Sequence, residues 1–337
     1  MPNLLSDTIE ANTWAREAIA RHIGGIYGEL VPGVIWTDAR AEDGSLLVEA
    51  DPRLLVHLLE REPLPLMQGH DPGRPIGHVL EAALFQAPHG EQFVAAILGY
   101  YTRDQTPTFA DLGLTNISAP PIVELPAPPS DLRIEIATDP REVSPEWVSS
   151  IAASAPLSVT KTSLSHNSSE TLQELIRIGL PYILLVWNPL VKAFCTELGK
   201  AAYAGLYTWL KGVIASASKH KAPLVCIECV QQDCHVSFLI RGNDVSLNYA
   251  AHEALSAAAV HAAKLIEVLA HRGMPPSKLV YEFDTKALRW FPSYAVLGNK
   301  RIIANSPMLI SAASDLPAGL SLGLSRKDMG RGKQVQN

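Results

Sequence analysis

The stretch PIGHVLEAALFQAPHGEQFVAAILGYYT, residues 75–102, decides the fold of the N-terminal part of this chain. It contains two long extended segments, 75–85 and 91–102, and His89-Gly90 punctuates the short loop between them. Two such segments joined by a short loop with a glycine are typical of a β-hairpin. We therefore predict two antiparallel strands here, inside an N-terminal region that is mainly β.

The sequence before this hairpin predicts helices and shorter strands. Residues 6–22 place apolar side chains approximately on one helical face and end at two glycines, which is typical of a helix. Short β-like runs follow between residues 26 and 49. Residues 51–61 (DPRLLVHLLER) predict a second helix, because Asp51 is a good N-cap and Pro52 is favoured at the first helical position.

A proline-rich segment separates the two halves of the chain. Residues 119–130 hold five prolines in twelve positions, a density that excludes regular structure and indicates a connector or covering arm. The chain stays loop-rich from residue 140 to 169. We therefore predict one domain over residues 1–139 and a second over 140–324, followed by a polar, aperiodic and disordered tail over 325–337.

The second half alternates helical and extended patterns, which predicts a layered α/β domain. The fold class is therefore α+β overall, with a β-rich N-terminal domain and an α/β C-terminal domain. The expected helices are 169–178, 190–218 and 249–271, and the expected strands are 182–187, 224–230, 235–241, 279–284, 288–292 and 301–304.

Composition excludes several classes of protein. The chain has 337 residues, of which 47% are hydrophobic and 18% charged, and its net charge is −6. This balance supports sizeable cores and gives no basic excess for nucleic acid. The most apolar run, Ile178–Trp187, is shorter than the ~20 residues that a membrane span needs. The N-terminus lacks the pattern of a signal peptide. We expect a cytoplasmic protein with no nucleic-acid or membrane partner.

Three cysteines and a histidine raise the question of a metal site. Cys226, Cys229, Cys234 and His235 lie in LVCIECVQQDCHVSFLI, and such a set invites a zinc interpretation. The flanking residues alternate as in a hairpin, however, so positions 226 and 229 face opposite sides. We predict buried hairpin cysteines, no metal and no cofactor, with a redox role as the remaining alternative.

Two other features have plain structural interpretations. Residues 241–244 (Arg-Gly-Asn-Asp) lie between a strand and a helix, where a glycine loop can bind an anion. We favour a turn with Asp244 as N-cap. His252, His261 and His271 lie at spacings that do not place them on adjacent helical turns. We interpret these three as surface or boundary histidines.

The segment 48–101 carries a resemblance to a known family. It contains Leu64-Pro65-Leu66, then His70-Asp71, then Pro75-Ile76-Gly77, and then the hairpin. In this pattern it resembles the prohead maturation proteases of tailed phages. The resemblance covers roughly residues 20–125 and implies a small β-barrel with flanking helices.

The resemblance also implies catalytic residues. His70 matches the family's catalytic base, and Ser118, which follows 48 residues later, matches the place of its nucleophile. A serine hydroxyl needs a base to take its proton, and histidine suits that task because its pKa lies near neutrality. A third group must orient the imidazole. Glu124 and Glu135 are the candidates, with Asp71 the weakest because an adjacent strand residue points to the other face.

Two functions remain open at this point. The first is a serine endopeptidase that acts on a protein substrate, with backbone N–H groups of the turn 71–74 as an oxyanion site and the C-terminal domain as a targeting or assembly module. The second is a catalytically inactive relative that acts as an assembly, sensor or protein-interaction module. Either is compatible with a homo-oligomer.

Overall fold

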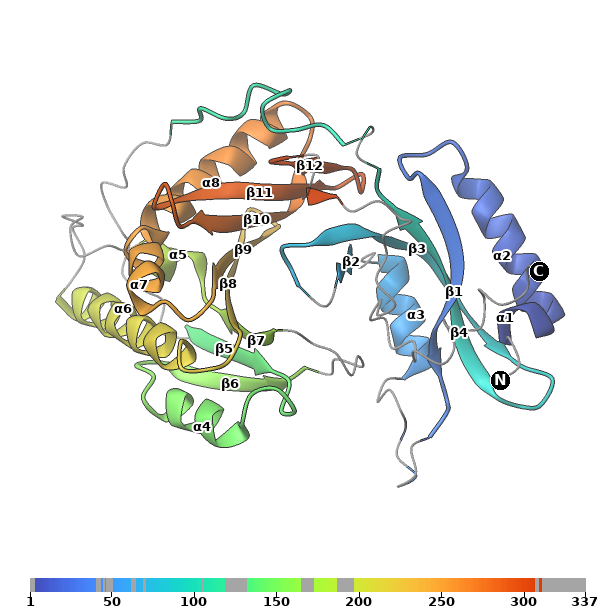
Figure 1. The fold of residues 1–337 in the computed structure, drawn as a ribbon, viewed down its shortest axis with the longest axis horizontal. Coiled ribbons are helices and arrows are strands. Elements are labelled where there is room, and N and C mark those ends of the chain that lie inside the picture. The colour runs from blue at the N-terminus through green and yellow to red at the C-terminus, as the bar shows by residue number, and fades with distance from the viewer. Residues whose placement is uncertain are drawn as a thin grey trace. The chain divides into compact units, whose positions relative to one another are not determined.

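The structure is a computed structural model that divides into two compact units, shown in Figure 1. The described residues up to Thr106, together with 309–310, form the first unit, and those from Pro107 to Ser306 form the second. The structure describes residues 4–40, 44, 46, 51–61, 65–68, 71–102, 104, 106–118, 132–164, 173–186, 197–306 and 309–310.

The first unit is built on a four-stranded sheet of order β1-β4-β3-β2 in which all neighbours are antiparallel. The predicted hairpin is confirmed, because β3 and β4 pair from Gly77↔Tyr100 to Gln86↔Gln92. The strands are β1 (Glu29–Thr37), β2 (Pro65–Met67), β3 (Pro75–Gln86) and β4 (Gln92–Tyr100).

Helices cover both faces of this sheet. Alternate residues of β4 face opposite ways, and all but the first are buried. Phe93 and Ala95 pack with Ala11 of α2, whereas Val94 and Ala96 pack in the cluster that includes Leu59 of α3. The helices are α1 (Leu4–Asp7), α2 (Ile9–His22) and α3 (Pro52–Arg61).

The described residues do not show the expected β-barrel. The sheet is open, with β1 and β2 as its edges. The physical reason lies in β4, whose two apolar faces are both covered by helices, so that the sheet buries its surface without closing on itself. The predicted start of α3 is confirmed, since Asp51 Oδ1 accepts hydrogen bonds from Arg53 N at 2.8 Å and Leu54 N at 3.2 Å.

The second unit is built on an eight-stranded mixed sheet of order β12-β11-β10-β9-β8-β7-β5-β6. Its strands are β5 (Arg133–Thr138), β6 (Ser158–Ser163), β7 (Glu174–Gly179), β8 (Pro223–Gln231), β9 (Cys234–Arg241), β10 (Pro276–Asp284), β11 (Arg289–Leu297) and β12 (Ile302–Ala304).

Three parallel pairs in this sheet are joined by helical crossovers. β5 pairs with β6, β7 with β8, and β9 with β10 in parallel, whereas β8–β9 and β10–β11 are antiparallel hairpins. The helices are α4 (Pro145–Ala153), α5 (Tyr182–Leu185), α6 (Glu197–Ala217), α7 (Val245–Glu253) and α8 (Leu255–His271).

All five of these helices contribute to one core on one face of the sheet. Every second strand residue points into that core, for example Ile176, Ile227, Phe238 and Leu279. The intervening residues point to the opposite face. We call it the helix-free face, because no helix in the described part of the second unit packs on it.

Two predicted elements of the second half are wrong. A helix was predicted over 169–178, but its described part belongs to strand β7 (Glu174–Gly179), and a strand was predicted over 182–187, but the chain forms the short helix α5 (Tyr182–Leu185) there. Residues 169–172 and 187 lie outside the described residues. The run from 178 to 187 is apolar throughout, so its pattern does not distinguish helix from strand. The expected loops from 140 to 169 contain α4 and β6.

The unit boundary differs from the predicted one at 139/140. The second unit begins at Pro107, because Phe109 and Leu114 lie in its core and Phe109 N donates to Ala304 O at 3.1 Å. β5 also pairs within its sheet. The predicted connector at 119–130 and the predicted tail at 325–337 lie outside the described residues.

The helix predicted over 249–271 is two helices. α7 and α8 meet at Ala254 with a bend of 50°. The predicted N-cap is confirmed, since Asp244 Oδ1 accepts from Ser246 N at 2.9 Å and Leu247 N at 3.1 Å. In the described part of the chain no single helix is long and apolar enough to cross a membrane, although α7 and α8 pass that test when taken together.

Candidate functional site

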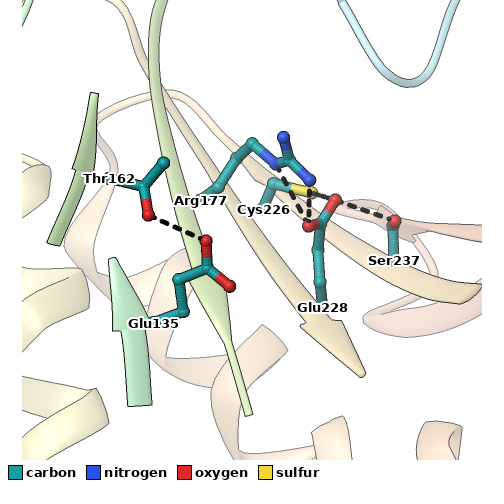
Figure 2. Close-up of polar contacts among 6 residues, drawn as sticks. All are labelled: Glu135, Thr162, Arg177, Cys226, Glu228 and Ser237. Carbon is teal, nitrogen blue, oxygen red and sulfur yellow. Dashed lines mark hydrogen bonds and ion pairs between the residues drawn. The ribbon is translucent and has the colours of Figure 1, made fainter. Parts of the chain in front are cut away.

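Polar side chains lie next to one another on neighbouring strands of the helix-free face, as Figure 2 shows for six of them. We call this set the polar row. Strand alternation and register place its members on the same face, because Arg177 pairs with Cys226 and Glu228 with Ser237. Its members are Thr162 of β6, Glu135 of β5, Arg177 of β7, Cys226 and Glu228 of β8, Ser237 of β9 and Lys278 of β10.

An ion pair lies at the centre of the polar row. Arg177 Nε and Nη2 both donate to Glu228 Oε2, at 3.1 Å and 2.6 Å (Figure 2). The Arg177 side chain is 41% exposed and that of Glu228 25%. Among the described residues, no acceptor is found for the remaining guanidinium hydrogens, those of Nη1 included. The Nη1–Nη2 edge of Arg177 therefore remains available to another acceptor.

Two further donors fix the Glu228 carboxylate. Its Oε1 accepts from Cys226 Sγ at 3.4 Å and from Ser237 Oγ at 3.3 Å. Burial raises the pKa of Glu228, but the charge and hydrogen bonds of Arg177 outweigh it and hold that pKa below its ordinary value. Burial also raises the pKa of the Cys226 thiol well above its ordinary value. The site therefore combines a carboxylate with a neutral thiol.

Lys278 brings a second basic group to the polar row. It is half-buried, and within the described residues it has no hydrogen bond or ion pair within contact distance. Burial lowers the pKa of Lys278, and this effect exceeds the opposing attraction of Glu228. The charge of Arg177 acts in the same direction as burial. This lysine is therefore easier to deprotonate than an ordinary one.

Gly179 lies on the same face, where the side chain of Glu135 approaches it closely. It pairs with Glu135 on one side and Glu228 on the other. A Cβ at position 179 would lie 3.2 Å from the Cβ of Glu135, closer than such contacts usually are. Glycine inside a strand often marks a place where another group approaches the backbone. Glu135 itself is exposed and accepts a hydrogen bond from Thr162 Oγ1 at 3.0 Å.

The four predicted catalytic residues are not seen together. His70 and Glu124 lie outside the described residues. Ser118 is exposed, belongs to the second unit, and has no side-chain hydrogen bond with any residue that the structure describes. Glu135 lies on β5 with Thr162 as its partner. The pairing of Ser118 with His70 therefore stays a prediction.

The turn at residues 71–74 does not offer the expected oxyanion site. Asp71 N donates to Gln68 O at 3.1 Å, Gly73 N to Asp71 Oδ1 at 2.8 Å, and Arg74 N to Asp71 O at 2.9 Å. Pro72 has no N–H to give. Because these donors are already used, none is left to stabilise a developing negative charge.

The cysteines follow the predicted alternation. Cys226 lies on the helix-free face, whereas Cys229 and Cys234 lie in the core on the helix side. All three are buried and free, and His235 is exposed. The described residues contain no group of three or more side chains of the kinds that ligate metals.

Sequence reasoning missed the residues at the centre of the polar row. Arg177 was assigned to a helix, Glu228 was placed on a strand without a role, and Lys278 lay one residue before a predicted strand. A charged residue inside an otherwise apolar strand was the available signal, since such positions are usually apolar. One histidine also differs from its interpretation, because His252 is 2% exposed and not a surface residue.

Comparison with known proteins adds no relative. No family model matches the chain, and no curated protein or solved structure gives a significant match.

Proposed function

We propose that this chain is a binding protein of the sensor type, whose second unit binds a carboxylate or phosphate group at Arg177 and Lys278 on the helix-free face. This proposal takes the second of the two functions left open by the sequence and gives it a site and a ligand chemistry.

The energetic cost of the polar row supports a functional role. Arg177, Glu228 and Lys278 lie on β7, β8 and β10, inside an eight-stranded sheet. Partial burial of charge is unfavourable, and apolar residues at such positions are often equally good for stability or better. The fold therefore gives little reason for these three charges, whereas perturbed ionisable groups are frequent at functional sites.

The unused donor edge of Arg177 carries the proposal. The polar row holds two basic groups, Arg177 and Lys278, and two carboxylates: Glu228 accepts hydrogen bonds from Arg177, and Glu135 accepts one from Thr162. Arg177 directs two donors at one oxygen and keeps its Nη1–Nη2 edge for another acceptor. A planar guanidinium edge matches the two oxygens of a carboxylate or phosphate.

Anion titration tests the proposal. We expect inorganic phosphate and acetate, added at constant ionic strength, to bind by calorimetry with a Kd of about 1 mM or below. Arg177→Gln and Lys278→Met should each weaken this binding about tenfold or more, the equivalent of one lost charge-assisted contact. Arg141→Gln is the matched control, because Arg141 pairs with Asp139 and is not a member of the polar row.

Two outcomes would contradict the proposed function. One is the absence of saturable binding by either anion. The other is binding that all three variants weaken equally, which would indicate attraction by the overall charge and not by a site. Thermal unfolding of each variant shows whether the fold is retained.

A serine endopeptidase is the second candidate, with His70 as base and Ser118 as nucleophile. Two observations favour it: β3 and β4 form the hairpin that the resemblance implies after His70, and the Ser118 hydroxyl is exposed. A fluorophosphonate probe should then label Ser118. Ser118→Ala and His70→Ala should each abolish labelling, since such residues act as a unit, whereas Ser163→Ala, another exposed serine, should not.

The third catalytic residue is tested in the same assay. Glu124→Gln or Glu135→Gln should slow labelling if that carboxylate orients His70. A chain that cleaves no protein, itself included, and leaves Ser118 unlabelled would remove the peptidase and leave the binding function.

A further inference from the structure

We infer that the ligand of the second unit is a zwitterionic amino acid, whose carboxylate binds the Arg177 guanidinium and whose ammonium group binds the Glu135 carboxylate. The inference rests on the proposed anion site and adds to it a second contact and a ligand class.

Strand pairing makes Glu135 and Arg177 diagonal neighbours on the helix-free face. In the antiparallel pair of β5 and β7, Glu135 pairs with Gly179. Arg177 lies two residues before Gly179 and pairs with Ala137. The Cβ atoms of such diagonal neighbours lie about 7–8 Å apart, a separation that long side chains bridge. Because glycine and alanine carry no polar side chain, Glu135 and Arg177 are the two members of this four-residue unit with which a ligand can form side-chain hydrogen bonds.

Glu135 keeps one carboxylate oxygen for a ligand. Its Oε1 accepts a hydrogen bond from Thr162 Oγ1 at 3.0 Å, which orients the carboxylate (Figure 2). Among the described residues, no donor is found for its Oε2. This oxygen lies 3.8 Å from the position that a Cβ at residue 179 would occupy, so the side chain extends from β5 towards the strand of Arg177. Glu135 is exposed, and a ligand in solution can therefore reach the second oxygen.

Arg177 offers the complementary group. Both of its hydrogen bonds to Glu228 go to one oxygen, and the Nη1–Nη2 edge matches the two oxygens of a carboxylate. Within the described part of the chain, no hydrogen bond or ion pair joins Arg177 to Glu135. A donor edge and an acceptor oxygen therefore lie near each other without being bonded to each other. An ammonium group donates hydrogen bonds and a carboxylate accepts them, and an amino acid carries both groups.

The charges of the polar row favour a zwitterion over a simple anion. The row has as many acidic as basic side chains, namely Glu135 and Glu228 against Arg177 and Lys278. A simple anion bound at Arg177 would lie near the Glu135 carboxylate, and the two negative charges would repel each other. A zwitterion adds no net charge, and its ammonium group replaces that repulsion with an attraction.

Calorimetry with matched pairs of ligands tests the inference on the full chain. Glycine, β-alanine and γ-aminobutyrate are compared near neutral pH with acetate, propionate and butyrate, which lack only the amino group. We expect at least one amino acid to bind about fivefold or more tighter than its partner, the fold-change that corresponds to an exposed ion pair worth about 1 kcal/mol. The three chain lengths allow for different separations between the two bound groups.

The ratio of the two affinities is then measured in variants. Glu135→Gln should bring the ratio for the preferred amino acid close to one, because the neutral amide no longer attracts the ammonium group. Glu146→Gln is the matched control and should keep the ratio of the wild type, because Glu146 is another exposed glutamate of the second unit that is not a member of the polar row. A variant that is partly unfolded would affect both ligands of a pair alike.

These measurements separate the inference from the proposed function. If acetate and phosphate bind but no amino acid is preferred over its partner, the amino-acid ligand is wrong and the anion site stands. The same conclusion follows if the preference survives in Glu135→Gln, since the ammonium group would then bind elsewhere. If neither the anions nor the amino acids show saturable binding, both are wrong.

Discussion

His252 of α7 is a buried histidine whose protonation should control stability. It is 2% exposed, its Nδ1 has no hydrogen-bond partner among the described residues, and its ring lies 4.3 Å from that of Tyr207 between centroids. It lines a cavity of about 20 Å³ together with leucines. Burial, assisted by the charge of Lys211, lowers the pKa of His252 to about 4.

We predict that the free energy of unfolding falls as the pH falls from 6.5 towards 4. The unfolded chain binds a proton at His252 below pH 6.5, whereas the folded chain does not until about pH 4, so acid favours the unfolded state in that window. The loss reaches about 3 kcal/mol. Urea unfolding measures the free energy of unfolding of the wild type and of His252→Met at each pH. Between pH 6.5 and 4 the wild type should lose about 3 kcal/mol more than the variant.

The exposed His235 supplies the control for this measurement. His235→Gln should keep the pH dependence of the wild type. Equal slopes for the wild type and His252→Met would contradict the assignment, because the titration would then belong to other groups.

Two glycines of the first unit show why single residues are hard to interpret from sequence. A Cβ at Gly77 would lie 2.1 Å from the carbonyl oxygen of Gly99, and one at Gly99 would lie 2.7 Å from the ring of Tyr27. The first clash would be with the paired strand, and the second would be with Tyr27, which lies before β1. The sequence shows two glycines in two predicted strands, but the contact that requires them depends on register. The same holds for Arg177 and Lys278. They are 101 positions apart in the sequence, but the strand order and register of the sheet place them on one face.

At the scale of elements, local signals predicted well what local chemistry determines. The hairpin of β3 and β4, helix α2, and the starts of α3 and α7 follow from turn residues, periodicity and capping side chains. The sequence predicted a helix at β7 and a strand at α5. An apolar run without periodicity does not distinguish the two, because its structure depends on its neighbours in the sheet. β7 lies between β5 and β8, and the sequence does not show that position.

The N-cap of α7 provides a prediction at this scale. Asp244→Ala removes the acceptor for Ser246 N and Leu247 N, and it should lower the free energy of unfolding of the second unit by about 1 kcal/mol. Asp244→Asn keeps an acceptor and should cost much less. Urea unfolding followed by circular dichroism measures both. If the two variants lose the same stability, the charge and not the hydrogen bond stabilises the helix start.

At the scale of the whole molecule, the cores explain the division into two units. The clusters of the first unit draw on residues between Leu4 and Tyr100, and the large cluster of the second unit draws on residues between Phe109 and Ile303. The boundary was predicted near residue 140 because residues 119–130 are rich in proline. The core of the second unit, however, already includes Phe109.

We therefore predict that the two units unfold as separate cooperative blocks. Leu98 is 3% exposed in the core of the first unit, and Leu269 is 0% exposed in the core of the second. Leu98→Ala and Leu269→Ala should each cost about 2–5 kcal/mol, through lost burial and a cavity. Hydrogen exchange in increasing urea, measured by mass spectrometry, resolves which segments lose protection.

Leu98→Ala should speed exchange in β1, β3 and β4 and leave β8 and β9 unchanged, and Leu269→Ala should do the reverse. The two substitutions are chemically identical, so each is the control for the other. Loss of protection in both units by either variant would show a single cooperative block. Anion binding gives a further check, because the polar row belongs entirely to the second unit. Saturating phosphate should protect β7, β8 and β10 and leave exchange in β3 and β4 as it was.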